Sequence, residues 1–449
     1  MVKKIRNILV LPIEIKVREF LPKLFLAYHV VANSKFNVYI GGQRFITRKY
    51  RPKSCVWFDK FTYAEVRKKV PYHEENEVVL QDEEGPISYH NPGTVRSRYT
   101  VEQKKFVKHF IFSGPRDIEK IRYLKLKEKK IFGLLKLDLL KKKNTIYDNE
   151  VKIIKKKYKN FLFIPGHSSK YRSTKQTEFV FKNVKKNNLV TDINNVNGNY
   201  AELVKLCIEI AKSNPGLTIV FRRHPNETNE NLKKLFKNKP KNIKLIYKFT
   251  VTPWIIACDY YLHAGCQTSL EGIALKKKII TFIPNKINTE DNFKLTKPFF
   301  RDGIKCLDFF NNKRKKLKNY TIQKKVKNIA VNLDNRLNYI DEFIKFLNIK
   351  YKYNMNSKIR PKKKFKKNFI ISFFMKCGSI IKSFMVKNDI YLGFIPKEYY
   401  IDKEIKEKKF KSIIIREIKL YIKMMQKIYK DNKKITIKKM SDSAFLLSK

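Results

Sequence analysis

Apolar runs and helical periodicity alternate along the chain, which predicts a succession of strands and helices. Near the N-terminus, the pattern predicts a strand at Asn7–Ile13, a helix at Lys16–Asn33 and a second strand at Phe36–Ile40. Further short apolar runs, each long enough for one strand, lie at 55–58, 77–80 and 106–112. Strands that alternate with helices in this way are typical of a parallel, doubly wound sheet.

A second set of apolar runs begins at 160–164 and predicts another sheet of the same kind. A helix is expected at 199–214, and strands are expected at 217–221, 259–263 and 279–283. The predicted fold class is therefore α/β, with two Rossmann-like doubly wound domains that face each other across a cleft. Because 449 residues exceed the size of one ordinary core, two or three domains are expected on length alone.

The expected boundaries follow changes in composition. Residues 1–155 form the N-terminal domain, which ends in a lysine-rich helical connector at 115–155, and residues 156–350 form the second domain. Residues 351–449 are expected to be a basic, mainly helical tail. This tail contains a basic run at 358–367 and a mixed apolar stretch at 369–386.

Basic side chains end one strand of the second domain. The strand at 217–221 is followed by Arg222, Arg223 and His224, and Pro225 then turns the chain outward. Ligands of open parallel sheets bind at the carboxyl ends of the strands, and the planar guanidinium of arginine suits phosphate. These residues are therefore a candidate phosphate site. The alternative is a basic surface loop on a basic protein.

A strand, a small-residue turn and a helix start follow one another at 259–271. Such an arrangement presents backbone N–H groups and a positive helix end to an anion. The residues assigned to this candidate donor-binding turn are His263, Gly265, Cys266, Gln267, Thr268, Ser269 and Glu271. Alternatively, the histidine is a core residue, the hydroxyls only cap the helix, and the glutamate only complements the helix dipole.

Three acids, Asp82, Glu83 and Glu84, directly follow the predicted strand at 77–80. In this topology, acids just beyond a strand end point into the ligand crevice, where one of them can accept a proton from a hydroxyl group. The alternative is a solvated acidic turn. The histidines and acids show no spacing typical of a metal site, so no metal is expected.

The net charge of +60 comes mainly from lysine, and part of this excess resembles a genome-wide codon bias. The remainder predicts attraction to anionic lipid, acidic polysaccharide or nucleic acid. The six cysteines are scattered, and the short apolar run at 8–13 fits a first strand better than an export signal. We therefore expect a cytoplasmic protein. An anionic membrane surface is a further expected partner, bound peripherally at the inner leaflet through the basic tail; packing helices are the alternative for this tail.

Four segments, in order, resemble motifs of one family. They are Leu11–Glu19 with Lys23–Ala27, Asp82–Gly85, Arg223–Glu227, and Pro253–Trp254 followed by His263–Glu271. Over about residues 7–290, the chain resembles the bacterial surface carbohydrate biosynthesis proteins, which are GT-B-like. It is also similar to polysialyltransferases and related capsule enzymes. Gln267 departs from the pattern because a threonine is common there, and so does the lysine run 276–278.

The resemblance implies a metal-independent glycosyltransferase that uses a nucleotide-activated sugar as substrate and no cofactor. Carried over, it makes Glu84 or Glu83 the general base and His224 the contact to the donor phosphate. The acceptor would be a glycan or lipid-linked glycan of the capsule or lipopolysaccharide type. Two alternatives remain, a nucleotide-sugar 2-epimerase of the same fold and a nucleic-acid-binding protein. Only the charge suggests nucleic acid, and the chain shows no nucleic-acid motif.

Overall fold

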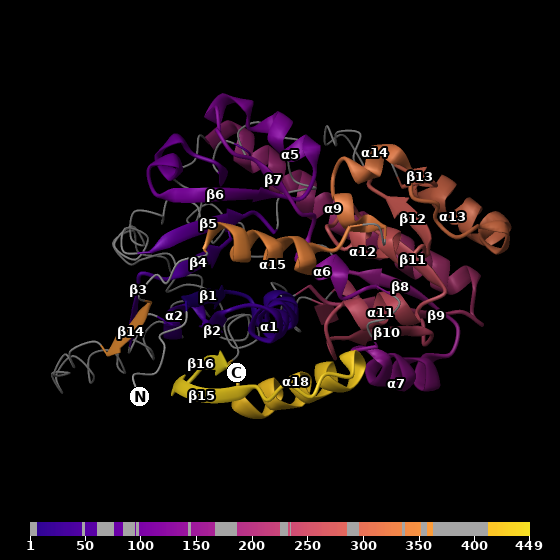
Figure 1. Ribbon diagram of the computed structural model, residues 1–449. Coiled ribbons are helices and arrows are strands. Elements are labelled where there is room, and N and C mark those ends of the chain that lie inside the picture. Colours follow the sequence, from indigo (N-terminus) through magenta and orange to yellow (C-terminus); the bar gives the residue numbers. More distant parts are fainter. Residues whose placement is uncertain are drawn as a thin grey trace, which may run out of the picture.

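A computed structural model gives the fold of the chain. It describes residues 7–46, 50–60, 76–83, 95, 98–141, 145–166, 186–224, 232–233, 235–284, 296–334, 337–351, 357–361 and 412–449. Statements about structure below refer to these residues. They form two α/β domains that lie side by side (Figure 1).

The sheet of the first domain has the order β15-β16-β2-β1-β4-β5-β6-β7. Neighbouring strands in the series β2-β1-β4-β5-β6-β7 are parallel, and β16 pairs with β2 in the antiparallel direction. The bounds are β1 Asn7–Ile13, β2 Phe36–Gly42, β4 Val56–Asp59, β5 Glu77–Gln81, β6 Val107–Phe112, β7 Lys130–Ile131, β15 Thr436–Ser441 and β16 Ala444–Ser448. The strand β16 thus stands where the third strand of a Rossmann sheet would lie.

The sheet of the second domain has the order β10-β9-β8-β11-β12-β13, and all its strands are parallel. Its strands are β8 Phe161–Pro165, β9 Thr218–Arg222, β10 Ile243–Ile246, β11 Tyr260–His263, β12 Lys278–Phe282 and β13 Phe299–Phe300. Counted along the chain, this is the order 3-2-1-4-5-6 of a Rossmann fold. The predicted fold class of two Rossmann-like doubly wound domains is therefore confirmed.

Helices cover both faces of each sheet because each face presents apolar side chains. In the first domain, α1 (Lys16–Asn33), α15 (Tyr339–Lys350) and α18 (Ile415–Tyr429) pack on one face (Figure 1). In the second, α7 (Asp148–Tyr158), α11 (Thr252–Ala257) and α12 (Ser269–Ala274) contribute to the core on one face, while α9 (Lys186–Ser213) and α13 (Gly303–Lys313) contribute to the other. The shorter elements are α2 Gln43–Ile46, α5 Pro115–Lys120, α6 Leu135–Asp138, α14 Lys324–Lys327, the strand pair β3 Tyr50–Lys53 and β14 Lys358–Pro361, and the 3-10 turns at 101–105, 122–124, 314–316 and 331–333.

In the described part of the chain, two segments connect the domains, one around α6 (Leu135–Asp138) and one around 331–338. Hydrogen bonds of Asn332 join these two crossings. The Asn332 side chain accepts from the Leu134 N–H at 2.8 Å and donates to the Leu134 carbonyl and to Asp138, both at 3.0 Å. Asp138 also accepts from the Ile340 N–H at 3.0 Å. Because these groups are buried, the polar contacts replace lost hydration and join the crossings into one unit.

Two regions differ from the expectation of a helical connector and a helical tail. Within 115–155, residues 130–131 form the edge strand β7 of the first sheet. Within 351–449, the hairpin β15–β16 joins the first sheet at β2. The helix α15, at the end of the range 156–350 expected for the second domain, packs on the first domain. The reason is that the apolar faces of α15 and β16 cover surface that the first sheet leaves exposed.

No helix in the described part of the chain is long and apolar enough to cross a membrane.

Candidate functional site

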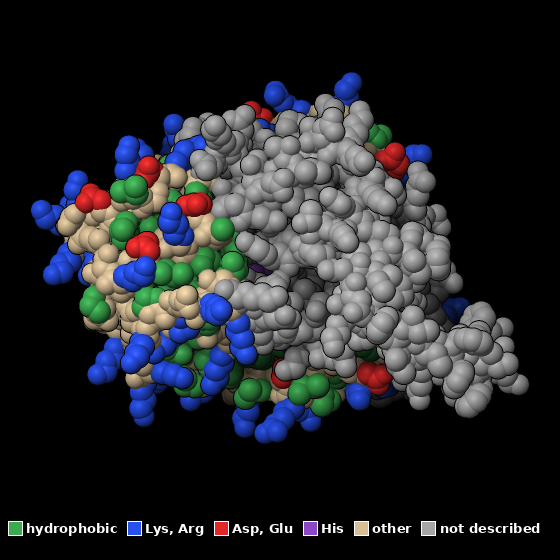
Figure 2. Space-filling view, turned by 180° about the vertical axis from the view of Figure 1, so that it is seen from behind, with side chains coloured by type: hydrophobic (Ala, Val, Ile, Leu, Met, Phe, Trp, Pro, Cys, Tyr) green, Lys and Arg blue, Asp and Glu red, His purple; other side chains and the backbone are tan. Residues whose placement is uncertain are grey.

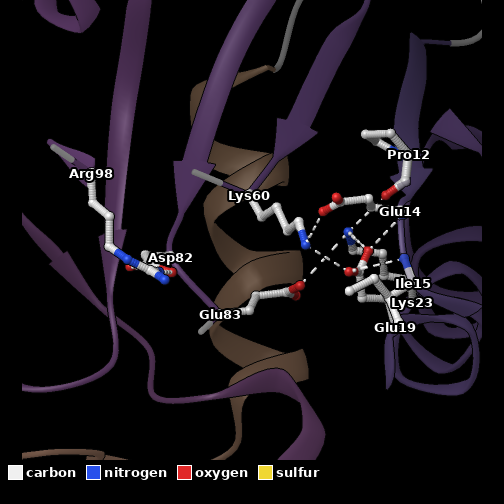
Figure 3. Close-up of polar contacts among 9 residues, drawn as sticks. All are labelled: Pro12, Glu14, Ile15, Glu19, Lys23, Lys60, Asp82, Glu83 and Arg98. Carbon is white, nitrogen blue, oxygen red and sulfur yellow. Dashed lines mark hydrogen bonds and ion pairs between the residues drawn. The ribbon is translucent and has the colours of Figure 1, made fainter. Parts of the chain in front are cut away.

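The first sheet has its topological switch point at β1, because β2 lies on one side of it and β4 on the other. The carboxyl ends of β1 and β4 are therefore neighbours, and Glu14 and Lys60 follow them directly. Doubly wound sheets bind ligands at this point. In this protein, a network of charged side chains lies there (Figure 3).

Glu19, in the first turn of α1, is the centre of this network. Its carboxylate accepts the backbone N–H groups of Glu14 at 2.8 Å and Ile15 at 3.2 Å. It also accepts a 2.8 Å hydrogen bond from Lys60, which pairs with Glu14 as well. Burial alone would raise the pKa of Glu19, but Lys23 and Lys60 outweigh burial and hold this pKa far below its usual range. Glu19 is therefore ionised and fixes the start of α1.

Lys23, one turn further along α1, is almost completely buried, with 1% of its side chain exposed. Its ammonium group donates to the Pro12 carbonyl at 2.7 Å and to Glu19 at 3.4 Å, and it lies 3.7 Å from the Glu83 carboxylate. Burial would lower the pKa of Lys23, but the carboxylates of Glu83 and Glu19 reverse this and raise it. Lys23 is therefore a permanent cation that holds Glu83 beside the switch point (Figure 3).

The acids that follow β5 have different environments. Asp82 is buried and accepts two 2.7 Å hydrogen bonds from Nη1 of Arg98, so its carboxylate is bound within the first domain. Glu83 points instead towards Lys23 and keeps 17% of its side chain exposed (Figure 3). Glu84, the other predicted base, lies outside the described residues. Of the two described acids of this run, Glu83 is thus the more exposed.

At the end of β9 in the second domain, Arg222 and Arg223 are both buried. Arg222 donates to the Phe249 carbonyl at 2.8 Å, and both guanidinium groups lie over the Tyr247 ring, at 5.3 Å and 4.4 Å from its centre. Burial lowers the pKa of Arg222 to about 10, so it remains a cation at neutral pH. His224 follows and is half-buried, whereas Pro225 lies outside the described residues.

His263 ends β11 and is fully buried, with both ring nitrogens in hydrogen bonds. Nδ1 accepts from the Gly265 N–H at 3.1 Å, and Nε2 lies 3.0 Å from the Thr281 hydroxyl. Because Nδ1 is an acceptor, the proton is on Nε2 and the ring is neutral. Gly265 has φ +75°, a conformation that favours glycine. His263 therefore shapes the turn from within the domain.

Side chains of the turn and of α12 bind one another. The Thr268 hydroxyl lies 2.7 Å from both the Tyr261 hydroxyl and the Cys266 thiol, and Ser269 is buried. Glu271 accepts from the Thr252 hydroxyl at 2.7 Å and pairs with Lys136 at 3.2 Å. These contacts connect α12 to α11 and to α6, which contains Lys136. Glu271 thus positions the turn relative to the rest of the chain.

Gln267 brings the two domains together at this turn. Its Nε2 donates a 2.5 Å hydrogen bond to the backbone carbonyl of Glu83, so the carboxyl edge of the first sheet meets the carboxyl edge of the second. The ends of β11 and β9 are two strands apart, which corresponds to about 10 Å. The structure therefore places Glu83 directly at the turn, with the Arg222–His224 segment about two strand spacings away.

Glu19, Lys23 and Lys60 were not among the site residues predicted from the sequence. A signal was present, because Glu19 and Lys23 are four residues apart and Lys23 lies among the apolar positions of the predicted helix. A charged residue on a buried helix face requires a partner. In the part of the chain that the structure describes, no cluster of three or more His, Cys, Asp or Glu side chains could hold a metal ion.

No family model and no curated protein matches this chain. Solved structures with a similar fold include UDP-GlcNAc 2-epimerase from Neisseria meningitidis, bound to UDP-GlcNAc, at 11% identity and a TM-score of 0.46, covering 76% of this chain and 99% of that one. A second is Anabaena HepE in complex with UDP and glucose, at 9% identity and a TM-score of 0.41, covering 78% of this chain and 100% of that one. A third is the wall teichoic acid polymerase TagF, at 11% identity and a TM-score of 0.39, covering 77% and 89%. The likeness is one of overall architecture.

Proposed function

We propose that this protein is a metal-independent, GT-B-type glycosyltransferase that transfers a sugar from a nucleotide-activated donor to a surface glycan of the capsule or lipopolysaccharide type. The nucleotide-sugar is a substrate in this proposal, and no cofactor takes part. The observation that carries the proposal is the hydrogen bond from Gln267 to the Glu83 carbonyl. It joins the backbone of Glu83, an acid whose side chain is 17% exposed, to the glycine turn of the other domain, and this proximity supports the proposal.

On the acceptor side, Glu83 is the described candidate for the general base, and the neighbouring Glu84 is the other. The carboxylate accepts the proton of the acceptor hydroxyl while the hydroxyl oxygen bonds to the anomeric carbon of the donor sugar. The bond from that carbon to the phosphate oxygen breaks, and the nucleotide leaves with the negative charge. Lys23 supports this role because it holds the Glu83 carboxylate from the side that is buried in the protein.

On the donor side, the leaving phosphate requires positive charge. In the proposal, His224 contacts the donor phosphate, while Arg222 and Arg223 supply fixed cations behind it. The Gly265 and Ser269 N–H groups bind within the protein, so the proposal assigns the N–H groups of Cys266 and Gln267, at a helix start, to the phosphate. The hydrogen bond between Cys266 and Thr268 forms part of the frame of this turn. Such preorganised charge stabilises the transition state without a metal ion.

The first test is a thermal-shift screen with CMP, CDP, UDP and GDP at two salt concentrations. At about 100 times its dissociation constant, a bound nucleotide adds roughly 2.7 kcal/mol to the stability of the folded protein. We expect one nucleotide to raise the melting temperature of the wild type and of the control Lys244→Ala, an exposed lysine of the same domain. The same nucleotide should have little effect on His224→Ala. If no nucleotide stabilises the wild type, the proposal fails.

The second test separates transfer from epimerisation. With the activated sugar of the stabilising nucleotide, a transferase releases free nucleotide only when a glycan acceptor is present, whereas a 2-epimerase changes the sugar without an acceptor. We expect Glu83→Gln to slow transfer by about 100-fold or more, because the amide cannot accept the proton. The control Glu209→Gln, in an exposed ion pair of α9, should leave the rate unchanged.

A further inference from the structure

The outer surfaces of α7 and α18 form one continuous face of the molecule, which we call the α7–α18 face. The two helices follow one another along the lower margin of Figure 1. Ile418, Ile422 and Met425 of α18 are buried against the first domain, and Val151 of α7 packs on the same apolar cluster. Ile154 of α7 is buried in the second domain. The opposite sides of both helices therefore face outward.

The outward side chains of this face are strongly basic. Those exposed on α18 include Arg416, Lys419, Lys423 and Lys427, and those exposed on α7 include Lys152, Lys155, Lys156 and Lys157. On α18 the four basic residues recur at helical spacing, so they form one stripe. The acid of α18, Glu417, is already paired with Lys16, and the acids of α7 are confined to its first turn, at Asp148 and Glu150.

The same face also exposes apolar side chains. Ile153 is 50% exposed, Ile414 is 49% exposed and Leu420 is 57% exposed. In the described part of the chain, six large apolar side chains are at least 49% exposed, and these are three of them. In Figure 2, hydrophobic and basic side chains lie close together along the lower margin of the molecule, with a few acidic ones among them. The lysine excess of the chain accounts for the charge alone, but it does not account for apolar side chains at the same place.

We propose that the α7–α18 face docks on the surface of an anionic phospholipid bilayer. Exposed isoleucine and leucine can enter the interfacial layer, while lysine and arginine stems lie along it and place their charges among the lipid phosphates. Each lysine near an anionic leaflet adds to binding, and this attraction falls with salt. A nucleic-acid backbone would use the charge but not the apolar side chains. The proposal does not depend on the proposed enzymatic activity.

Flotation of the full chain with vesicles tests the proposal. One set of vesicles contains equal parts of phosphatidylglycerol and phosphatidylcholine, and the other contains phosphatidylcholine alone. The charge variant Lys419→Glu/Lys423→Glu/Lys427→Glu is compared with Lys315→Glu/Lys316→Glu/Lys318→Glu, which changes the net charge equally on an exposed segment of the second domain. The apolar variant Ile153→Ser/Leu420→Ser is compared with Ile304→Ser/Ile349→Ser, which removes two exposed isoleucines elsewhere.

We expect the wild type to bind the anionic vesicles and not the neutral ones. The charge variant on α18 should lose at least tenfold in partition coefficient and its control less than twofold. The apolar variant should lose severalfold, and its control should bind as the wild type does. Equal losses in a variant and its control would overturn the proposal, since binding would then be diffuse. Binding of a DNA duplex is measured in parallel. If the protein binds DNA through the α18 lysines and does not bind the vesicles, the proposal is also overturned.

Discussion

Gln267 and Glu83, which are far apart in the sequence and belong to different domains, are joined by a 2.5 Å hydrogen bond from the Gln267 amide to the Glu83 carbonyl. The acceptor is a backbone oxygen, so the contact fixes the position of the β5 end while the Glu83 carboxylate points to Lys23. The contact thereby holds the carboxyl edge of the first sheet next to the carboxyl edge of the second. A threonine, which is common at this position in the family that the chain resembles, is shorter and lacks an amide donor.

Replacing Gln267 by alanine removes this contact. We expect Gln267→Ala to lower the free energy of unfolding by about 1 kcal/mol, the usual contribution of one hydrogen bond. Urea unfolding measures this change. The control is Gln323→Ala, an exposed glutamine of the same domain, which should leave the stability unchanged. An equal loss in the two variants would mean that the contact contributes nothing specific.

Lys23 is the residue on which the charged network depends. Replacing it by methionine keeps most of the volume but removes the buried cation beside Glu83 and leaves Glu19 with Lys60 as its remaining lysine partner. Breaking a buried ion pair from one side is strongly destabilising, so we expect Lys23→Met to lose about 3 kcal/mol. Lys35→Met, at an exposed lysine just beyond the same helix, is the control. Chemical denaturation of both variants gives the difference, and a similar stability for the two would refute the role of Lys23.

Gly272 allows α12 to lie close to β11. A Cβ at this position would be 2.7 Å from the Tyr261 ring, which is too close for an unperturbed structure. We expect Gly272→Ala to lower the stability by about 1–3 kcal/mol through overpacking. Because Tyr261 also binds Thr268, nucleotide binding at the turn should weaken as well. Gly216→Ala, where a Cβ meets nothing within 4 Å, is the matched control, measured by the same unfolding and binding experiments.

Asp117 makes the stability depend on pH. Burial raises the pKa of Asp117 to about 7, and Asp82 adds to this, while Arg116 and the Ser113 N–H oppose it. An unfolded carboxyl titrates near pH 4. Between about pH 4 and pH 7, the folded protein therefore retains a proton that the unfolded chain has lost. The contribution of Asp117 to stability consequently falls as the pH rises through this window.

Asp117→Asn removes this titration and keeps an oxygen that can accept the Ser113 N–H. We expect the variant to be more stable than the wild type by about 1–3 kcal/mol at pH 8, with little difference at pH 4. Thermal unfolding at a series of pH values measures the difference. Asp308→Asn, at an exposed aspartate of α13, should follow the wild type at every pH. A stabilisation that is equal at pH 4 and pH 8 would exclude the proposed titration.

Much of the architecture was predictable from local sequence patterns. The helix Lys16–Asn33 and the strand Asn7–Ile13 were predicted with their observed bounds. The order of strands and helices around 160–283 was sufficient to identify a second doubly wound domain. Apolar periodicity and turn residues act over a few positions, so the sequence displays them directly. The strand ends at or just before Glu83, Arg222 and His263 were located for the same reason.

The sequence by itself therefore determined the central strands of both sheets, the helix Lys16–Asn33 and the polar residues that follow several strand ends. Only the tertiary structure decided what those residues contact: that Asp82 binds Arg98, that Glu83 faces Lys23, and that β16 returns to pair with β2. An edge strand pairs through backbone groups that almost every residue carries, so the side-chain pattern does not predict which strand it will pair with. Likewise, which buried charges form ion pairs depends on which side chains lie close together in the folded protein, and the sequence does not show this.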